Sequence, residues 1–228
     1  EEEWPSKNIS FKNFELAAQN KLATQEKNKN YNSSLGRINS TQICGLSSGE
    51  YCAIWLGPEW PGDQRFDDSL SLCFDSDQME LKADIVGAPL IKLRIKANKP
   101  YGQIAVRLCD VAPDGTSSRI TYGVLNLKVI NGFEESKPLV LNKETELSFE
   151  LDHIAYRLPK KHKLRVAISN TYWPLIWPEP ESAEIEVLSG SLKLPTRTQS
   201  ITDEWIFPEP ILAPEWKHKK LRKSKNSR

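Results

Sequence analysis

The chain of 228 residues is long enough for one large β domain or two small domains, and its hydrophobic content of 39%, with seven Trp, seven Phe and six Tyr, is enough to form a core. Its formal net charge is +1, but seven of its 31 basic residues lie within 217–228, which leaves 24 basic against 30 acidic residues in the rest. A mildly acidic body is not expected to bind nucleic acid, because that binding needs clustered Lys and Arg side chains.

The sequence also disfavours a membrane protein and a zinc-binding protein. No run of eighteen apolar residues occurs and the chain begins Glu-Glu-Glu, so the sequence predicts neither a membrane span nor a signal peptide. The four cysteines, Cys44, Cys52, Cys73 and Cys109, contain no C-x-x-C pair, which argues against zinc. We expect four free thiols, no metal, no cofactor and a location in the reducing cytoplasm. The first residue is not Met, which suggests a piece of a longer protein.

The first third of the chain gives weak signals. Residues 9–16 (ISFKNFEL) alternate imperfectly and predict one or two short strands. Residues 45–80 are rich in Gly, Pro and Asp and predict a long irregular connection without a helix. We expect Trp55, Trp60 and Phe66 to pin this connection to the core.

The clearest strands lie in the middle of the chain. Two runs alternate apolar and other residues with the period of a strand: Ile91, Leu93 and Ile95, then Ile104, Val106 and Leu108. The intervening residues of the first run are Lys92, Arg94 and Lys96, so its second face is expected to be solvated and the sheet antiparallel. A turn is predicted at 111–115, where Pro113 fixes φ and Gly115 takes the left-handed conformation.

Four later segments alternate in the same way: 145–151, 163–169, 183–188 and 191–194. Only residues 152–157 suggest a helical turn. Short strands at this density, with almost no helical period, predict an all-β, antiparallel jelly-roll β-sandwich. We expect one domain over residues 1–214 and a disordered basic tail over 215–228.

One motif resembles a hydrolase nucleophile. Residues 45–49 (GLSSG) match G-x-S-x-G, in which the serine, here Ser47, sits on a turn between a strand and a helix. Pro58 follows soon after and no helix is predicted, so the context does not fit. The bases available to a triad are His153, His162 and His218. All three are expected to be structural or exposed, and we assign no catalytic residue.

A group of aspartates could supply oxygen ligands for calcium. Its members are Asp63, Asp67, Asp68, Asp75 and Asp77. Their spacing fits no calcium loop, and aspartates in Gly- and Pro-rich segments commonly bind backbone groups of turns. The sequence therefore favours turn contacts over a metal site.

The aromatic segment 172–178 (YWPLIWP) is more informative. Tyr172, Trp173 and Trp177, together with Trp55 and Trp60, are candidates for a domain interface or a ligand platform, because large rigid rings anchor partners and stack on sugars. The alternatives are that the tryptophans plug the end of the domain's own core, pack against another domain, or hold a sugar.

Several segments together resemble one known family. They are 61–65 (PGDQR), 67–70 (DDSL), 74–76 (FDS), 86–89 (VGAP), 106–115 (VRLCDVAPDG), 121–126 (TYGVLN) and 172–174 (YWP). In the residues of these segments and in their order, the chain resembles the C-terminal domain of the CocE/NonD hydrolases. That group includes cocaine esterase, α-amino-acid ester hydrolases and X-Pro dipeptidyl-peptidases. The resemblance extends from about Trp4 to Pro210.

The resemblance implies a fold and a role. It implies a jelly roll of the galactose-binding-domain-like type that lies against an α/β-hydrolase domain carrying a Ser-Asp-His triad. It also implies that none of the triad has a counterpart in this chain. Residues 128–130 (KVI) and the basic tail depart from the family pattern without affecting the expected fold.

Three functional hypotheses follow. The first is the non-catalytic C-terminal domain of a CocE/NonD-like serine hydrolase, which packs in cis against and shapes a catalytic domain that acts on esters or X-Pro peptide bonds. The second is a free-standing jelly-roll module that binds a carbohydrate or another partner through its aromatic residues, since fold alone does not fix function. A small esterase centred on Ser47 is the weakest reading.

Overall fold

The structure, a computed structural model, describes residues 3–24, 34–51, 60–198 and 208–212. Within these residues the strands are β1 (Ile9–Ala17), β2 (Lys21–Ala23), β3 (Gly36–Ile38), β4 (Leu72–Asp75), β5 (Ala83–Gly87), β6 (Leu90–Ala97), β7 (Gln103–Val111), β8 (Ser117–Asn126), β9 (Thr145–Glu150), β10 (Ile154–Leu158), β11 (Lys163–Ser169) and β12 (Ile185–Arg197). The helical elements are η1 (Ala18–Asn20), α1 (Arg65–Ser69) and η2 (Leu127–Val129).

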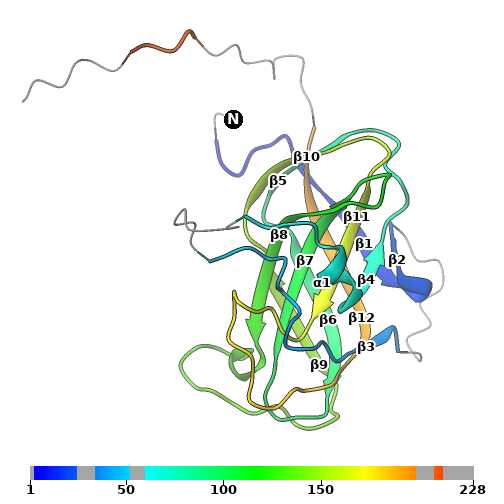
Figure 1. The fold of residues 1–228 in the computed structure, drawn as a ribbon, viewed down its shortest axis with the longest axis vertical. Coiled ribbons are helices and arrows are strands. Elements are labelled where there is room, and N and C mark those ends of the chain that lie inside the picture. Colours follow the sequence, from blue (N-terminus) through cyan, green and yellow to red (C-terminus); the bar gives the residue numbers. More distant parts are fainter. Residues whose placement is uncertain (1–2, 25–33, 52–59, 199–207, 213–228) are drawn as a thin grey trace, which may run out of the picture. The chain divides into compact units, whose positions relative to one another are not determined.

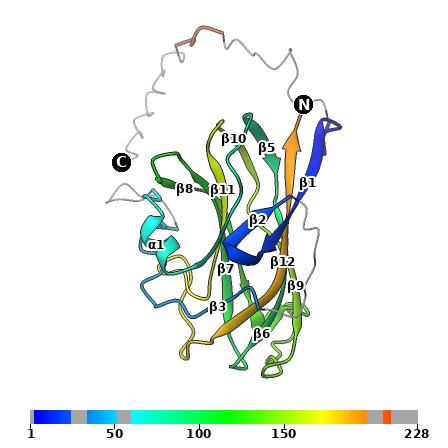
Figure 2. The same ribbon diagram turned by 90° about the vertical axis from the view of Figure 1, so that its right-hand side faces the viewer.

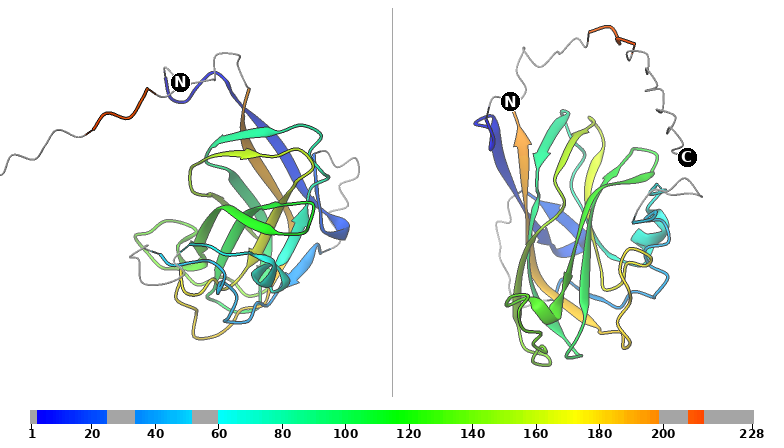
Figure 3. Two further views of the ribbon diagram at one scale, coloured as in Figure 1. Left: turned by 45° about the horizontal axis from the view of Figure 1, so that its top comes forward. Right: turned by 90° about the vertical axis from the view of Figure 1, so that its left-hand side faces the viewer.

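The strands form two layers that face each other (Figure 1 and Figure 2). One layer has the order β9-β6-β12-β1, and the other has the order β4-β11-β7-β8. These pairs are antiparallel, and the layers are joined at β2, which pairs antiparallel with β1 and through one parallel bridge with β4. The chain crosses repeatedly from one layer to the other, as Figure 3 also shows. The predicted all-β antiparallel sandwich is confirmed; its likeness to galactose-binding domains stays a prediction.

The core lies between the layers and follows the predicted alternation. Ile91, Leu93 and Ile95 of β6 are buried in it, as are Ile104, Val106 and Leu108 of β7 and Leu164, Val166 and Ile168 of β11. These side chains bury apolar area from both inner faces, which is the main favourable term for the fold.

Strand β7 departs from simple alternation, because all nine of its residues are buried. The residues that alternate with its core-facing residues, among them Arg107 and Cys109, point to the outer side of the strand and are buried as well. The cover comes from the connection before β4, whose Asp68 contacts Arg107. A strand covered on both sides occupies the centre of the molecule, and the polar groups on its outer side must find partners there.

Several boundaries differ from the sequence predictions. The segments 183–188 and 191–194 belong to one strand, β12, with a register shift between Val187 and Ser189. The helical turn expected at 152–157 is wrong, because residues 154–157 belong to strand β10, which pairs with β5. The connection 45–80 contains the short helix α1, where Asp63 accepts a hydrogen bond from the backbone of Arg65.

The described residues up to Thr198 belong to one compact unit. The predicted domain end at residue 214 stays a prediction, and the basic tail lies outside the described residues. Among the helices of the described residues, none is long and apolar enough to cross a membrane.

A tight contact at Gly190 of β12 gives a test of the packing. A Cβ atom at this position would lie 2.6 Å from Leu16 Cδ1 and 2.7 Å from Leu93 Cδ2. We expect Gly190→Ala to lower the free energy of unfolding by about 1 to 3 kcal/mol, because the surrounding core must shift. Urea denaturation measures this loss. Gly62→Ala is the control, since nothing lies within 4 Å of its added methyl group; equal stability of the two variants would contradict the packing.

Candidate functional site

Three loop segments cover the outer side of β7 and β8, and we call them the loop layer: residues 41–51, 60–71 and 171–178. Backbone hydrogen bonds tie them together, from Trp173 N to Cys44 O (3.0 Å) and from Gly62 N to Ser47 O (3.0 Å). Gln64 N also donates to Ser117 O of β8 (2.8 Å). Loops that lie far apart in sequence therefore form one surface beside α1 (Figure 2).

A buried ion-pair network attaches the loop layer to the sheet. Arg107 Nη2 donates to Asp68 Oδ1 (3.0 Å), and both side chains are almost fully buried. Asp68 Oδ2 accepts from Ser117 Oγ (2.7 Å) and from Arg165 Nη1 (3.0 Å). Arg165 in turn binds Asp75 through two hydrogen bonds of 2.6 and 2.8 Å, which raise the pKa of the guanidinium. One carboxylate from α1 thus links three strands.

The second buried carboxylate of α1 organises the 45–49 segment. Asp67 Oδ1 accepts from Gly45 N (2.9 Å) and its Oδ2 accepts from Ser47 N (3.1 Å). Gly45 has φ +114°, and a Cβ there would lie 2.2 Å from Trp173 O. The glycine is therefore required by the close approach of two backbones and by its left-handed conformation.

The nucleophile elbow is not present at Ser47. Ser47 is held by its backbone: its N–H donates to Asp67, and its carbonyl accepts a hydrogen bond from Gln64 Nε2 at 2.6 Å. The next helix in the described residues is α1, which begins at Arg65, and no hydrogen bond of the described residues joins Ser47 to a histidine. The motif match is explained by a turn that Asp67 holds.

Each of the candidate calcium aspartates has a basic partner instead. Asp63 binds Arg65 (2.6 Å) and Asp77 lies 3.7 Å from Lys21, while Asp67, Asp68 and Asp75 belong to the arginine network. The described part of the chain contains no group of three or more His, Cys, Asp or Glu residues placed to hold a metal. Turn contacts explain only Asp63 and Asp67.

The histidines do not assemble a triad in the described residues. His153 is exposed, and His218 lies outside the described residues. His162 was expected at the surface, but its Nδ1 lies 2.7 Å from Asp110 Oδ1, and Asp110 Oδ2 accepts from Tyr156 Oη (2.7 Å). This carboxylate holds the turn before β11 onto β7 and β10.

Three of the four cysteines are free thiols, and Cys52 lies outside the described residues. Burial raises the pKa of Cys73 and of Cys109 to about 12, and it also raises the pKa of Cys44. These thiols are therefore protonated near neutral pH and pack as small apolar groups.

The candidate aromatic residues divide into buried and exposed members. Tyr172 is fully buried, with its ring 5.5 Å from the Arg107 guanidinium. Trp173 is partly exposed and packs edge-on against Trp177, which is 80% exposed, and Trp60 is 78% exposed. The expectation that Trp60 and Phe66 pin the connection is wrong, because the buried aspartates of α1 hold it; Trp55 lies outside the described residues.

A pocket of about 340 Å³ opens between the loop layer, β8 and residues 152–154. Its lining includes Tyr51, Trp60, Arg119 and Tyr122. The Arg119 guanidinium lies 4.6 Å from the ring centre of Tyr122 and donates to Tyr172 Oη at 2.6 Å. The pocket thus combines aromatic side chains with one arginine and two acidic side chains, Glu50 and Asp152.

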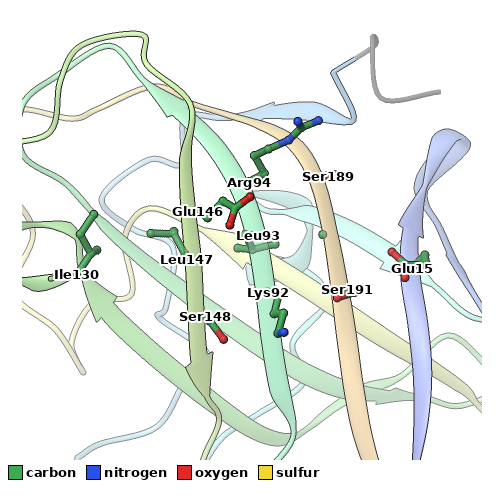
Figure 4. Close-up of a pocket in the computed structure, with 11 residues that line it drawn as sticks. Glu15, Lys92, Leu93, Arg94, Ile130, Glu146, Leu147, Ser148, Ser189 and Ser191 are labelled. Atoms are coloured by element: carbon green, nitrogen blue, oxygen red, sulfur yellow. The ribbon is translucent and has the colours of Figure 1, made fainter. Parts of the chain in front are cut away.

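A second hollow, of about 670 Å³, lies on the layer that contains β6, β9 and β12 (Figure 4). Lys92 and Ser148 are paired across β6 and β9, as are Arg94 and Glu146. Arg94 also forms an ion pair with Glu144 at 3.3 Å. Two acidic and two basic side chains line this hollow, Glu15 and Glu146 with Lys92 and Arg94, so its charge is balanced, as expected for the solvated face of β6. Among the described residues that line it there is no aromatic side chain or histidine.

Sequence reasoning missed Arg107, Arg119 and Arg165. A signal was available for Arg107, because it is a charge inside the otherwise apolar run 104–109 and the chain offers the pair Asp67 and Asp68 upstream. No pattern in the sequence indicates the environment of Arg119.

The ion-pair network predicts a large stability difference between two aspartates. We expect Asp68→Asn to lower the free energy of unfolding by about 3 to 5 kcal/mol, because it removes the buried charge that binds both Arg107 and Arg165. Asp67, 3.5 Å from Arg107, remains as the second acidic partner of that arginine. Asp77→Asn is the control, with an expected loss below about 1 kcal/mol, since its ion pair with Lys21 is exposed. Chemical denaturation of both variants measures the difference, and similar losses would contradict the assigned role of Asp68.

Solved structures with this fold come from hydrolases. An α-amino acid ester hydrolase superposes with a TM-score of 0.70 at 19% identity, covering 82% of this chain and 36% of that one. An aminopeptidase from a marine sediment Thaumarchaeota archaeon superposes with a TM-score of 0.72 at 16% identity, and the match covers 86% of this chain and 38% of the aminopeptidase. A CocE/NonD family hydrolase from Staphylococcus aureus superposes with a TM-score of 0.60 at 11% identity, and the match covers 85% of this chain and 38% of that hydrolase. At these identities the likeness concerns the fold, and the chain spans little more than a third of each protein.

No curated protein sequence matches the chain. A family profile does match, over residues 1–207, and its description is the X-Pro dipeptidyl-peptidase C-terminal non-catalytic domain. Because this match covers most of the chain, and the solved neighbours carry the same fold, the chain belongs to the family of X-Pro dipeptidyl-peptidase C-terminal non-catalytic domains.

Proposed function

We propose that this chain is the non-catalytic C-terminal domain of a CocE/NonD-like serine hydrolase that cleaves esters or X-Pro peptide bonds. In this proposal an α/β-hydrolase domain of the same protein supplies the triad, and the present domain packs against it and shapes its substrate cleft. The family match over residues 1–207 is the observation that carries the proposal. The buried free thiols agree with a reducing compartment such as the cytoplasm.

The loop layer is the surface that we assign to this packing. Its exposed large apolar side chains are Ile43, Leu46, Tyr51, Trp60, Phe66, Trp173 and Trp177. Hydrogen bonds between the loops and the buried network beneath them hold these side chains in place, so little conformational entropy is lost when a partner covers them. Rigid Trp and Tyr side chains are common anchors of interfaces.

The proposal predicts where hydrolysis resides. We expect residues 1–228 alone to leave p-nitrophenyl esters and X-Pro p-nitroanilides uncleaved, and the complete protein encoded by the gene to cleave one of these classes. Ser47→Ala in the complete protein is expected to leave the rate unchanged, because Asp67 holds Ser47 by its backbone in a turn. Release of p-nitrophenol or p-nitroaniline measures both. Cleavage by residues 1–228 alone would overturn the proposal.

The assigned surface predicts a pattern of amide hydrogen exchange. In the complete protein, amides of residues 41–51 and 171–178 are expected to exchange at least about tenfold more slowly than in residues 1–228 alone, because a partner domain excludes water from them. Residues 130–137 are the control: Phe133 there is 89% exposed but lies outside the loop layer, and its segment is expected to exchange equally in both. Equal exchange of all three segments would refute the assigned surface.

The alternative is a free-standing carbohydrate-binding module, which the exposed ring of Trp177 beside Trp173 favours. A glycan array separates the two functions. Saturable glycan binding that Trp173→Ala abolishes, without protection of the loop layer in the complete protein, would select the alternative.

A further inference from the structure

The pocket beside β8 holds an arginine in a fixed position. In the pairing of β7 with β8, Cys109 lies opposite Arg119 and Leu108 lies opposite Thr121, so Ile120 is an extra, unpaired residue. A bulge of this kind redirects neighbouring side chains. The Arg119 guanidinium lies 4.6 Å from the ring centre of Tyr122 and 5.8 Å from that of Tyr172.

The charge of Arg119 has no acidic partner among the described residues. Arg65, Arg107, Arg157 and Arg165 all form ion pairs with aspartates, whereas no Asp or Glu of the described chain does so with Arg119. Its hydrogen bond goes to Tyr172 Oη at 2.6 Å. Burial raises the pKa of Tyr172 to about 12, so the phenol is neutral near pH 7 and does not offset the positive charge.

One hydrogen bond leaves most of the guanidinium donors available. A guanidinium carries five N–H groups in a planar fork that matches the two oxygens of a carboxylate. Arg119 lines a pocket of about 340 Å³ whose walls include the rings of Tyr51 and Trp60. Aromatic walls next to a fixed cation fit a ligand with an apolar body and one negative end.

We propose that the pocket around Arg119 binds a carboxylate attached to an apolar or aromatic group, with the carboxylate on Arg119 and the apolar group against Trp60 and Tyr51. Glu50 and Asp152 line the same pocket and repel anions, so a bound carboxylate must contact Arg119 and lie away from these two side chains. The repulsion grows with the charge of the ligand, which disfavours anions with two or more charges. The ligand is therefore a monocarboxylate. This inference does not depend on the proposed hydrolase function, because it concerns the pocket of residues 1–228 themselves.

Titration of residues 1–228 with benzoate, followed by Trp fluorescence, tests the proposal. Benzoate is expected to bind saturably. Benzamide has the same shape without the charge, and we expect it to bind at least about tenfold more weakly because it loses the charge-assisted hydrogen bonds to Arg119. Phthalate, which carries two charges, is expected to bind more weakly than benzoate. Absence of saturable benzoate binding, or equal binding of benzoate and benzamide, would overturn the proposal without any variant.

Variants locate the site. Arg119→Gln is expected to weaken benzoate binding at least about tenfold and Arg119→Lys to retain part of it, while Arg65→Gln serves as an exposed arginine control and is expected to change nothing. Unchanged binding in folded Arg119→Gln would overturn the assignment.

Repeating the titration on the complete protein shows whether the pocket stays accessible there. Retained benzoate binding there would indicate a free monocarboxylate ligand. Binding to residues 1–228 that is lost in the complete protein would indicate that a neighbouring domain covers the pocket, as the assignment of Tyr51 and Trp60 to the packing surface implies. If the complete protein failed to cleave esters and X-Pro anilides, the titrations of residues 1–228 with benzoate and benzamide would still stand. The proposed hydrolase function and the proposed carboxylate pocket can therefore fail separately.

Discussion

The ion pair between Arg107 and Asp68 is the interaction on which the functional side of this domain depends. It connects the outer side of β7 to the first helix of the loop layer, and the same carboxylate also binds Ser117 and Arg165. Removing a buried charge from water is costly, so such a pair is stable only when each member finds the other and further hydrogen bonds. The loops and the sheet therefore specify each other's position.

This arrangement explains why apolar side chains can stay exposed in an ordered way. Trp60 and Trp177 contribute little to the core, yet both belong to loops that the buried network and backbone hydrogen bonds hold. The order of the loop layer comes from polar contacts beneath it rather than from burial of its own rings. A surface built in this manner can present aromatic side chains to a partner without collapsing onto the domain.

Sequence periodicity was sufficient for the sandwich but not for the loop layer. Alternation in β6, β7 and β11 is a direct result of one face meeting the core, so a single sequence reveals it. The merging of two segments into β12 depends on a bulge near Ser189, which leaves no local signal. The pocket at Arg119 requires Tyr172, 53 residues away, and such a contact comes from tertiary structure alone. The sequence favoured turn contacts for the aspartates of α1 and did not reveal their ion pairs, because their arginine partners are distant in sequence.

The contact between Gly45 and the backbone of Trp173 has a consequence for how this domain can change. A side chain of any size at position 45 would overlap the carbonyl of Trp173, so neither loop can be lengthened, shortened or exchanged without refitting the other. Transplanting the tryptophan loop into a related scaffold would thus require moving residues 41–51 with it. The two segments therefore form one structural unit, although more than a hundred positions separate them along the polypeptide.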